Sequence, residues 1–299
     1  MVIVLTVAVL ALSTAMCFNC VPFNWKNVLA ACNIKRTVRQ ESTVRFLSVG
    51  QGNCAVIMSG GKAALIDCAP AESAAAIISA IDELGITRIE YIFITHPHDD
   101  HAGGFCELSK RYEIGTVVIP PLSPDNSYTE YAVRRAIDRC NITETAPETG
   151  ASYRLGGAQV TVQFYTPDAD SENDCSAVYR AEVGEMSFLF TGDLSSGGER
   201  ALMKSGADVN CDVLLASHHG SGESSCAEFI RAAQPQCVIC SCGINNTFGH
   251  PSQELINRLK NDGILYFRTD TDGDITAFAN RMQIASQYGG LSVSVNPPA

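Results

Sequence analysis

The stretch THPHDDHAGG, residues 95–104, holds three of the six histidines of the chain within the six positions from His96 to His101. Two aspartates, Asp99 and Asp100, lie between the second and third of these histidines. The stretch directly follows the apolar run YIFI, which predicts a buried β-strand. Loops at the ends of such strands often carry functional side chains in α/β proteins, so this turn predicts a chemical site.

Three further apolar runs end in side chains of the same kinds. FLFT is followed by Gly192 and Asp193, LLAS by His218 and His219, and ALI by Asp67. A single histidine is more often a structural residue than a ligand, but four strand ends with imidazoles or carboxylates favour a metal site. Imidazole and carboxylate donors together suit zinc, iron or manganese.

The spacing predicts two neighbouring metal positions. The first two imidazoles of the turn can reach one ion, and the aspartate–histidine pair that ends the turn can reach a second. A carboxylate has two oxygens, so Asp193 can bridge the ions, and His219 can complete the coordination of the second ion. Asp99 is expected to be solvated or to support a ligand. The predicted ligands are His96, His98, Asp100, His101, Asp193 and His219.

The pattern around these motifs predicts an α/β fold of two sheets with helices outside. Glycine-bearing turns separate short apolar runs, and amphipathic stretches such as 71–85 predict helices between the strands. Further helices are expected over 104–112, 127–140 and 252–263. The expected strands are 44–49, 54–59, 63–67, 89–94, 116–120, 158–165, 176–183, 186–190, 212–217, 236–242, 264–269 and 274–279.

Composition bounds the class of protein. The 299 residues are 46% hydrophobic and 18% charged, which suits one large globular domain or two small ones. The formal net charge of −11 repels nucleic-acid phosphate on average, although bound divalent metals make a site locally positive. The spacing of Cys237 and Cys240 resembles half a zinc site, but a strand points these residues to opposite faces, which favours core packing.

The first 18 residues carry no charge, which favours a signal segment or membrane anchor over residues 1–20. The alternative is a chain that begins inside a longer membrane protein. Under the first interpretation the catalytic part lies outside the cytoplasm, either secreted or anchored to the membrane. The predicted organisation is an anchor over 1–20, a linker over 21–42, a hydrolase domain over 43–285 and a tail over 286–299.

Six segments together resemble one family. They are VRFLSVGQGNCAVIMSGGKAALID, ITHPHDDHAGG, FTGD, ASHHGS, NNTFGHP and RTDTDGDI, in this order between about residues 43 and 280. The His-x-His-x-Asp-His turn is the hallmark of the metallo-β-lactamase superfamily. The whole set is similar to the C-terminal hydrolase domain of the competence DNA-uptake protein ComEC and its stand-alone relatives.

The resemblance implies a four-layer αββα sandwich and a metal-dependent hydrolase, a phosphodiesterase or nuclease, with one or two zinc or manganese ions. It implies the ligands given above, and it favours His219 over His218 because the ligand directly precedes glycine in this superfamily. Asp67 is then expected to hydrogen-bond a metal ligand without contacting the metal itself. Asp100, His218 and His250 are expected to act in catalysis. The implied substrate is DNA or a cell-envelope phosphodiester.

The sequence departs from the family pattern at two places. Asn53 replaces the usual aspartate after GQG, and no histidine lies between His101 and His218, where many members of the superfamily supply a ligand. Asn173, Asp174 or Cys175 is expected to fill that gap, and an oxygen ligand favours manganese. The alternatives are a metal-poor binding protein of the same fold, or a hydrolase of another ester, a thioester or a lactam.

Overall fold

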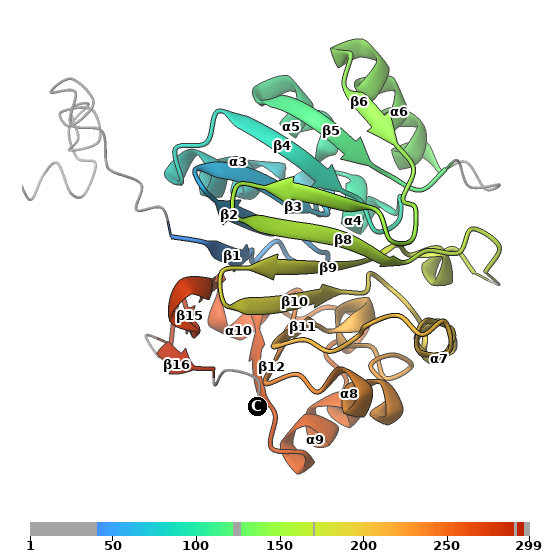
Figure 1. Ribbon diagram of the computed structural model, residues 1–299, viewed down its shortest axis with the longest axis vertical. Coiled ribbons are helices and arrows are strands. Elements are labelled where there is room, and N and C mark those ends of the chain that lie inside the picture. The colour runs from blue at the N-terminus through green and yellow to red at the C-terminus, as the bar shows by residue number, and fades with distance from the viewer. Residues whose placement is uncertain (1–40, 122–126, 170, 290–291, 296–299) are drawn as a thin grey trace, which may run out of the picture. The chain divides into compact units, whose positions relative to one another are not determined.

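The computed structural model describes residues 41–121, 127–169, 171–289 and 292–295, all within one compact unit (Figure 1). The expected anchor over 1–20 and nearly all of the expected linker lie outside the described residues. Within the described ranges, no helix combines the length and the apolar character needed to cross a membrane.

Two mixed sheets form the centre of the fold. In spatial order, the first sheet contains β16 (Ser292–Ser294), β15 (Gln283–Ser286), β14 (Ile275–Phe278), β1 (Thr43–Phe46), β2 (Ala55–Ser59), β3 (Lys62–Ile66), β4 (Arg88–Phe93), β5 (Glu113–Val118) and β6 (Thr143–Thr145). The second contains β13 (Leu265–Arg268), β12 (Cys237–Cys240), β11 (Val213–Leu215), β10 (Met186–Phe190), β9 (Val178–Val183), β8 (Ala158–Phe164) and β7 (Ser152–Leu155).

The parallel parts of the sheets decide where the predicted site lies. Strands β3 to β6 are parallel neighbours in the first sheet, and β10 to β13 are parallel neighbours in the second. The carboxyl ends of parallel neighbours lie at one edge of a sheet. The loops after β3 and β4, and those after β10, β11 and β12, carry the predicted site residues other than Asn173 and Asp174, which follow β8.

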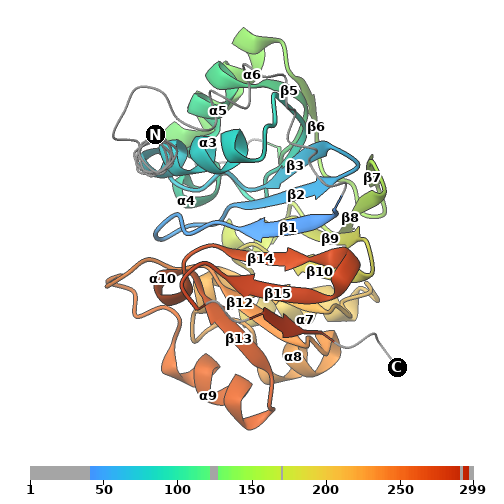
Figure 2. The same cartoon turned by 90° about the vertical axis from the view of Figure 1, so that its left-hand side faces the viewer.

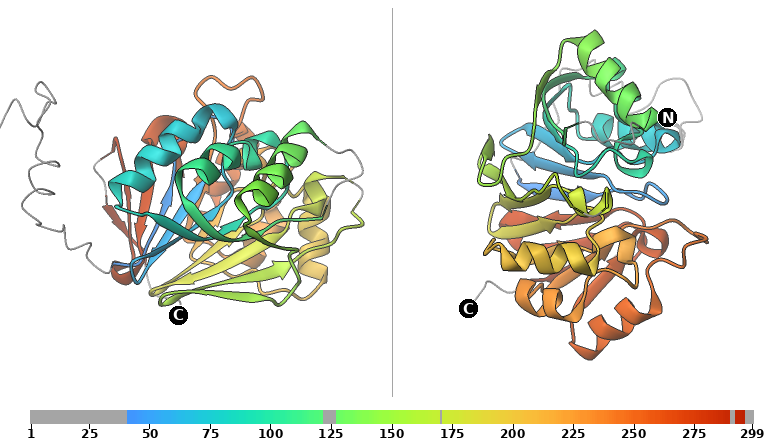
Figure 3. Two further views of the ribbon diagram at one scale, coloured as in Figure 1. Left: turned by 90° about the horizontal axis from the view of Figure 1, so that it is seen from above. Right: turned by 90° about the vertical axis from the view of Figure 1, so that its right-hand side faces the viewer.

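Helices cover the outer face of each sheet. Those from the N-terminal half lie on one side and those from the C-terminal half on the other, as Figures 2 and 3 show. On the first sheet these are α3 (Ala74–Glu83), α5 (Phe105–Arg111) and α6 (Tyr128–Cys140), and on the second α7 (Ser196–Lys204), α8 (Ala227–Ala233) and α9 (Gln253–Asn261). This order of layers confirms the predicted αββα sandwich.

The shorter helical segments lie close to the sheet ends. The two short α-helices are α4 (Asp99–Ala102) and α10 (Thr269–Asp272). The 3-10 turns are η1 (Ala71–Ser73), η2 (Asn173–Cys175), η3 (Ser217–Gly220) and η4 (Ala279–Arg281). Ser127 caps the start of α6, since its side chain accepts a hydrogen bond from the Glu130 amide at 3.1 Å, and Ser252 caps α9 in the same way.

The inner faces of the two sheets pack on each other through large aromatic side chains. Phe46 lies 6.4 Å from Phe188 and 6.0 Å from Phe190 between ring centroids, and Phe93 lies 5.2 Å from Tyr179. Complete burial of each such phenylalanine stabilises the fold by about 1.5–3 kcal/mol. This core holds the two sheets together, and with them the loops at their edges.

The cysteines of β12 confirm the prediction of core packing. Cys237 is buried between the two sheets, whereas Cys240 is buried on the helix-covered face. Burial raises the pKa of both thiols. Their side chains therefore point to opposite faces of the strand, as a period of two requires, and they act as small apolar residues.

Four strands were not predicted, namely β6, β7, β15 and β16. The residues of β6, TET, carry no apolar signal, and this strand forms at an edge of the first sheet by pairing with β5. Strand β16 lies within the segment predicted as a C-terminal tail, where it pairs antiparallel with β15, and Val295 beyond it is buried. The first sheet therefore continues past residue 285.

Candidate metal centre

The histidine-rich turn is folded into α4 directly after β4. The amides of His101 and Ala102 both bond the carbonyl oxygen of His98, at 3.1 and 2.8 Å, which brings the imidazoles of this turn onto one side. The loop after β1 packs closely on the turn, because the Asn53 amide donates to the Asp100 carbonyl at 3.0 Å. A Cβ atom on Gly52 would lie 2.6 Å from the same carbonyl oxygen, so the GQG motif needs glycine there.

Asp67 fixes the orientation of His101. The Asp67 Oδ2 atom accepts a hydrogen bond from His101 Nδ1 at 2.8 Å, and Oδ1 accepts one from the Thr95 amide at 2.8 Å. Both side chains are fully buried. Since Nδ1 carries the proton in this bond, the Nε2 atom of His101 is turned toward the remaining site residues, as expected of a ligand held by an outer carboxylate.

Asp193 lies at the centre of the cluster. Its Oδ1 atom is 3.1 Å from His101 Nε2, and its Oδ2 atom is 3.6 Å from His218 Nε2, 3.7 Å from His219 Nε2 and 4.0 Å from His96 Nε2. The Asp193 amide donates to Ser176 Oγ at 3.1 Å, which fixes this turn after β10. One carboxylate thus faces four of the predicted site imidazoles.

The two histidines after β11 both lie in the left-handed region of the backbone. His218 has φ of 52° and His219 has φ of 56°, a strained conformation for residues with a Cβ atom. His219 Nδ1 donates to the Ser241 carbonyl at 3.0 Å, and its Nε2 lies 3.1 Å from Asp100 Oδ2. The strain turns His219 inward, while the His218 side chain stays about one-third exposed at the mouth of the site.

A buried glutamate holds this strained turn in place. Glu199 of α7 accepts hydrogen bonds from Ser217 Oγ at 2.8 Å, from the Ser225 amide at 2.6 Å and from the Cys226 amide at 2.8 Å. These donors lie on both sides of the two histidines in the chain. Glu199 is therefore a positioning residue for the turn after β11, and it was not recognised from the sequence.

The donor atoms fit a divalent cation. One ligand atom each from Asp100, His101, Asp193 and His219 lies within 4.8 Å of all the others. His101 Nε2 and Asp193 Oδ1 are buried and 3.1 Å apart, yet neither has a hydrogen-bond partner of good geometry among the described residues. Buried polar atoms are normally satisfied, so two that converge without a bond indicate a site for a cation.

The electrostatics of the cluster favour positive charge at its centre. Burial alone would lower the pKa of His101, but the carboxylates of Asp193 and Asp67 outweigh burial and raise this pKa well above its usual value. The pKa of Asp193 is lowered despite burial, because His101, His219 and His96 surround it. The same carboxylates stabilise a bound cation.

A second convergence involves the first two histidines of the turn. His96 Nε2 lies 3.0 Å from His98 Nδ1, and the other ring nitrogen of His98 lies 2.8 Å from Glu172 Oε2. Burial and the neighbouring imidazoles of His101 and His98 lower the pKa of His96, which keeps it neutral as a metal ligand must be. Glu172 therefore holds His98 as Asp67 holds His101.

The three residues predicted to replace the missing histidine, on the segment after β8, differ in their contacts. Both oxygens of Asp174 accept hydrogen bonds from Ser195, at 2.8 Å from its amide and 3.0 Å from its hydroxyl, so these contacts do not support Asp174 as a replacement ligand. The Cys175 thiol is directed to the Pro167 carbonyl. The Asn173 Oδ1 atom is buried without a partner among the described residues, which leaves it available as an oxygen ligand.

His250 adjoins the cluster on the side of His218 and His219. Its ring centroid is 5.6 Å from that of His218 and 6.4 Å from that of His219. The Gly243 amide donates to Gln51 Oε1 at 3.2 Å, so the Gln51 Nε2 atom faces His250 Nδ1 at 3.3 Å. Burial and the two neighbouring imidazoles lower the pKa of His250 to about 4, so the ring is neutral at pH 7.

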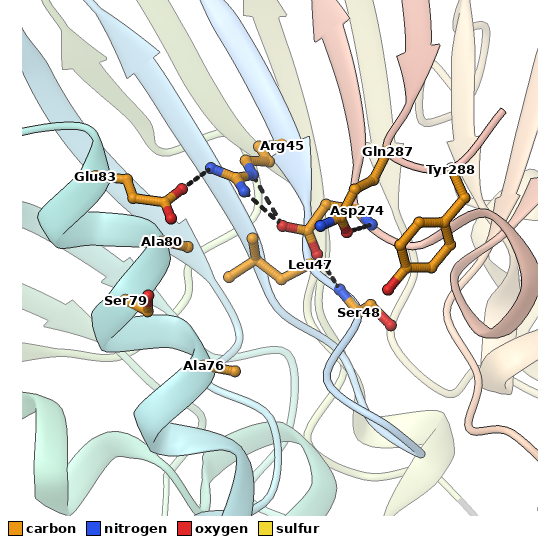
Figure 4. Close-up of a pocket in the computed structure, with 10 residues that line it drawn as sticks. All are labelled: Arg45, Leu47, Ser48, Ala76, Ser79, Ala80, Glu83, Asp274, Gln287 and Tyr288. Carbon is orange, nitrogen blue, oxygen red and sulfur yellow. Dashed lines mark hydrogen bonds and ion pairs between the residues drawn. The ribbon is translucent and has the colours of Figure 1, made fainter. Parts of the chain in front are cut away.

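A separate pocket of about 250 Å³ lies between α3 and the strands β1 and β14 (Figure 4). Arg45 in this pocket pairs with Asp274 at 2.7 Å and with Glu83 at 3.4 Å. The Asp274 carboxylate also accepts a hydrogen bond from the Ser48 amide at 2.7 Å. The charges in this pocket therefore satisfy one another, and it contains none of the predicted site residues.

Comparison with known proteins supports the fold and the family. The chain is 32% identical over 214 residues to ComE operon protein 3 of Bacillus subtilis, covering 71% of this chain and 27% of that protein. It is 27% identical over 252 residues to competence protein ComA of Neisseria gonorrhoeae, covering 83% and 34%. The chain thus spans about a third or less of the length of these relatives.

A solved structure shows the same fold. The metallo-beta-lactamase fold protein YhfI from Bacillus subtilis aligns with a TM-score of 0.54 at 11% identity, over 79% of this chain and 99% of that one. Residues 47–243 match the family model described as the metallo-beta-lactamase superfamily. These residues include the four donors that converge, and the chain belongs to the metallo-β-lactamase superfamily.

Proposed function

We propose that the chain is a metal-dependent phosphodiesterase. The observation that carries the proposal is the convergence of Asp100, His101, Asp193 and His219, whose donor atoms lie within 4.8 Å of one another. His101, His219 and His98 each donate a hydrogen bond from one ring nitrogen to an oxygen of another residue. These bonds support the proposal, since such partners orient metal-binding imidazoles. The hydrolase fold of the superfamily supplies the framework.

Two sets of residues are assigned to metal positions in this proposal. Asp100, His101 and His219 would hold one cation, His96 and His98 would hold the other, and Asp193 would be shared between the two sets. The buried, unpartnered Asn173 oxygen is the proposed further ligand of the second set. When bound, such cations act as Lewis acids and lower the pKa of a coordinated water toward 7. Zinc and manganese are the proposed metals, because imidazole and carboxylate ligands suit both.

The remaining histidines handle the substrate. The Gln51 amide donates to His250 Nδ1, so a neutral His250 carries its proton on Nε2 and can donate a hydrogen bond to a phosphoryl oxygen. His218 lies partly exposed beside Asp193 and next to His250, so it can also contact the substrate. Asp67 and Glu172 keep the ligand imidazoles in one tautomer throughout.

The proposed substrate is a phosphodiester of DNA or of the cell envelope. The resemblance to the hydrolase domain of the DNA-uptake protein ComEC favours DNA, and competence protein ComA is among the relatives. The net charge of −11 favours a smaller or envelope phosphodiester, because it repels long polyanions. We also propose that the chain acts outside the cytoplasm, on the strength of its uncharged first 18 residues.

Hydrolysis of bis-p-nitrophenyl phosphate, single-stranded DNA and a glycerol phosphodiester, with zinc or manganese added, tests the proposal. The wild-type chain should hydrolyse the first compound, and the Asp100→Ala plus His101→Ala variant should not. Asp99→Ala is the matched control, because Asp99 is exposed and bonds Thr129 instead of the cluster. Equal activity of the double variant and the wild type would overturn the proposal, and the other two compounds distinguish the substrate classes.

A further inference from the structure

Three rings extend from the metal centre toward the surface. The His219 ring lies 6.4 Å from that of His250 at an interplanar angle of 27°, and His250 lies 5.7 Å from Phe248 at 26°. The planes of successive rings are thus nearly parallel. His219 is buried, His250 is half-buried, and the Phe248 side chain is 68% exposed. Phe248 therefore presents an aromatic ring at the surface, next to His250.

The loop that carries Phe248 is held by its own side-chain hydrogen bonds. This loop joins β12 to α9 and projects from the sheets (Figure 2). The Asn246 Nδ2 atom donates to the carbonyls of Gly243 at 2.9 Å and His250 at 2.6 Å, and its Oδ1 accepts from the His250 amide at 2.9 Å. Gln51 ties the loop to the opposite sheet through Gly243.

Single exposed apolar side chains are common and need no explanation. Phe248 differs because its ring continues a stack of site imidazoles and because Ile244, on the same loop, is also 74% exposed. A ring on a loop held in this way loses less entropy than one on an unrestrained loop when a planar group packs against it. Aromatic pairs prefer offset-stacked or edge contacts at ring distances of about 4.5–7 Å.

We infer that Phe248 forms a binding subsite for a planar aromatic or heterocyclic group attached to the phosphoryl group at the metal centre. The subsite is uncharged, so the acidic net charge of the chain does not oppose binding there. This inference rests on the proposed function for the position of the phosphoryl group. It makes Phe248 a specificity residue that favours aryl or nucleoside esters over alkyl esters.

Direct binding of two small phosphonates tests the inference without any turnover. Phenylphosphonate and methylphosphonate carry the same charged group and differ in the ring. Titration calorimetry with the zinc-loaded full chain should show tighter binding of phenylphosphonate, by about three- to tenfold. Phe248→Ala should remove this preference without changing methylphosphonate affinity, and Phe248→Trp should keep it. Tyr288→Ala is the control, since Tyr288 is 70% exposed but lines the separate pocket of Figure 4.

Each outcome decides the question. A wild-type chain without preference for the phenyl compound, or a preference that survives Phe248→Ala, would overturn the inference. A preference that is lost in Phe248→Ala but kept in Phe248→Trp and Tyr288→Ala supports the inference. Failure of the proposed phosphodiesterase activity appears separately, as absent hydrolysis of bis-p-nitrophenyl phosphate by a wild-type chain that still binds phosphonates.

Discussion

Glu172 Oε2 lies 2.8 Å from His98 Nε2, while the other nitrogen of the same imidazole lies 3.0 Å from His96 Nε2. A carboxylate can only accept in this contact, so it fixes the proton of His98 on Nε2. The Nδ1 atom is then free of a proton and faces His96. Glu172 therefore orients His98 as the predicted ligand role requires.

Replacing Glu172 tests this relationship. We expect Glu172→Ala to weaken binding of one of two cations by about 10- to 100-fold, the usual effect of removing an outer partner of a ligand histidine. Titration calorimetry with zinc or manganese measures the two sites. Asp168→Ala is the matched control, because Asp168 is an exposed carboxylate on the same connection. Equal affinities in the two variants would argue against this role of Glu172.

Asp67 is expected to act on the other cation. Thr95 and His101 contact the two carboxylate oxygens of Asp67. Asp67→Asn replaces one of these oxygens by an NH₂ group, so one donor loses its acceptor. The affinity of the site at His101 should fall by about 10- to 100-fold. Asp212→Asn provides the comparison, since Asp212 is also a buried carboxylate that accepts from a backbone amide, but it bonds Ser187.

In that comparison both variants should lose stability, and only Asp67→Asn should lose metal affinity. Thermal unfolding of the chelator-treated proteins measures the first quantity, and calorimetric titration measures the second. An affinity that falls equally in Asp67→Asn and Asp212→Asn would mean that general destabilisation explains the loss.

Glu199 predicts a dependence of stability on pH. Burial raises the pKa of Glu199 above its ordinary value of 4.5, and hydrogen bonds from Cys226, Ser217 and Ser225 limit the rise. The folded protein therefore holds this proton more tightly than the unfolded chain does. The resulting stabilisation is fully present below pH 4.5 and is lost as the pH rises through the folded pKa.

Glu199→Gln removes this titration. The free energy of unfolding of the wild type minus that of the variant should therefore decrease between pH 4.5 and pH 7, as measured by urea unfolding at each pH. Gln also supplies one acceptor oxygen where Glu supplies two, which should cost about 1–3 kcal/mol. A difference that stays constant or grows with pH would contradict the direction of the pKa shift.

Gly192 should tolerate no side chain. It has φ of 55°, and a Cβ atom would lie 2.7 Å from Ser176 Oγ and 2.8 Å from Thr95 Cβ. Gly192→Ala should lower the free energy of unfolding by about 1–3 kcal/mol and displace Asp193 from the cluster. Gly157→Ala is the control, because its Cβ would meet only Ser59 Oγ at an ordinary 3.5 Å. Similar unfolding free energies for the two variants would show that the turn relaxes.

Convergence of the site could be predicted because parallel strands bring their carboxyl ends to one edge. The turns after β4, β10 and β11 each follow an apolar run that is plain in the sequence, and the structure brings their histidines and aspartates together. Asp67, after β3, contacts His101 for the same reason. The roles of these residues as ligands stay predictions.

Glu172 and Glu199 could not be predicted in this way. Glu172 lies on the connection between β8 and β9, whose path no periodicity reveals, and its contact with His98 depends on that path. In the sequence, Glu199 looks like any polar residue of a helix. It is buried only because α7 contacts the turn after β11. Polar edge strands such as β6 likewise form by pairing, because their residues carry no signal of their own.

The metal content of the full chain is the most direct test of the central claim, which is that these buried donors hold divalent cations. Elemental analysis after loading with zinc or manganese and removal of free metal should find between about one and two cations per wild-type chain. The Asp100→Ala plus His101→Ala variant should hold about one fewer. A wild-type chain that retains well under one cation with either metal would contradict the claim.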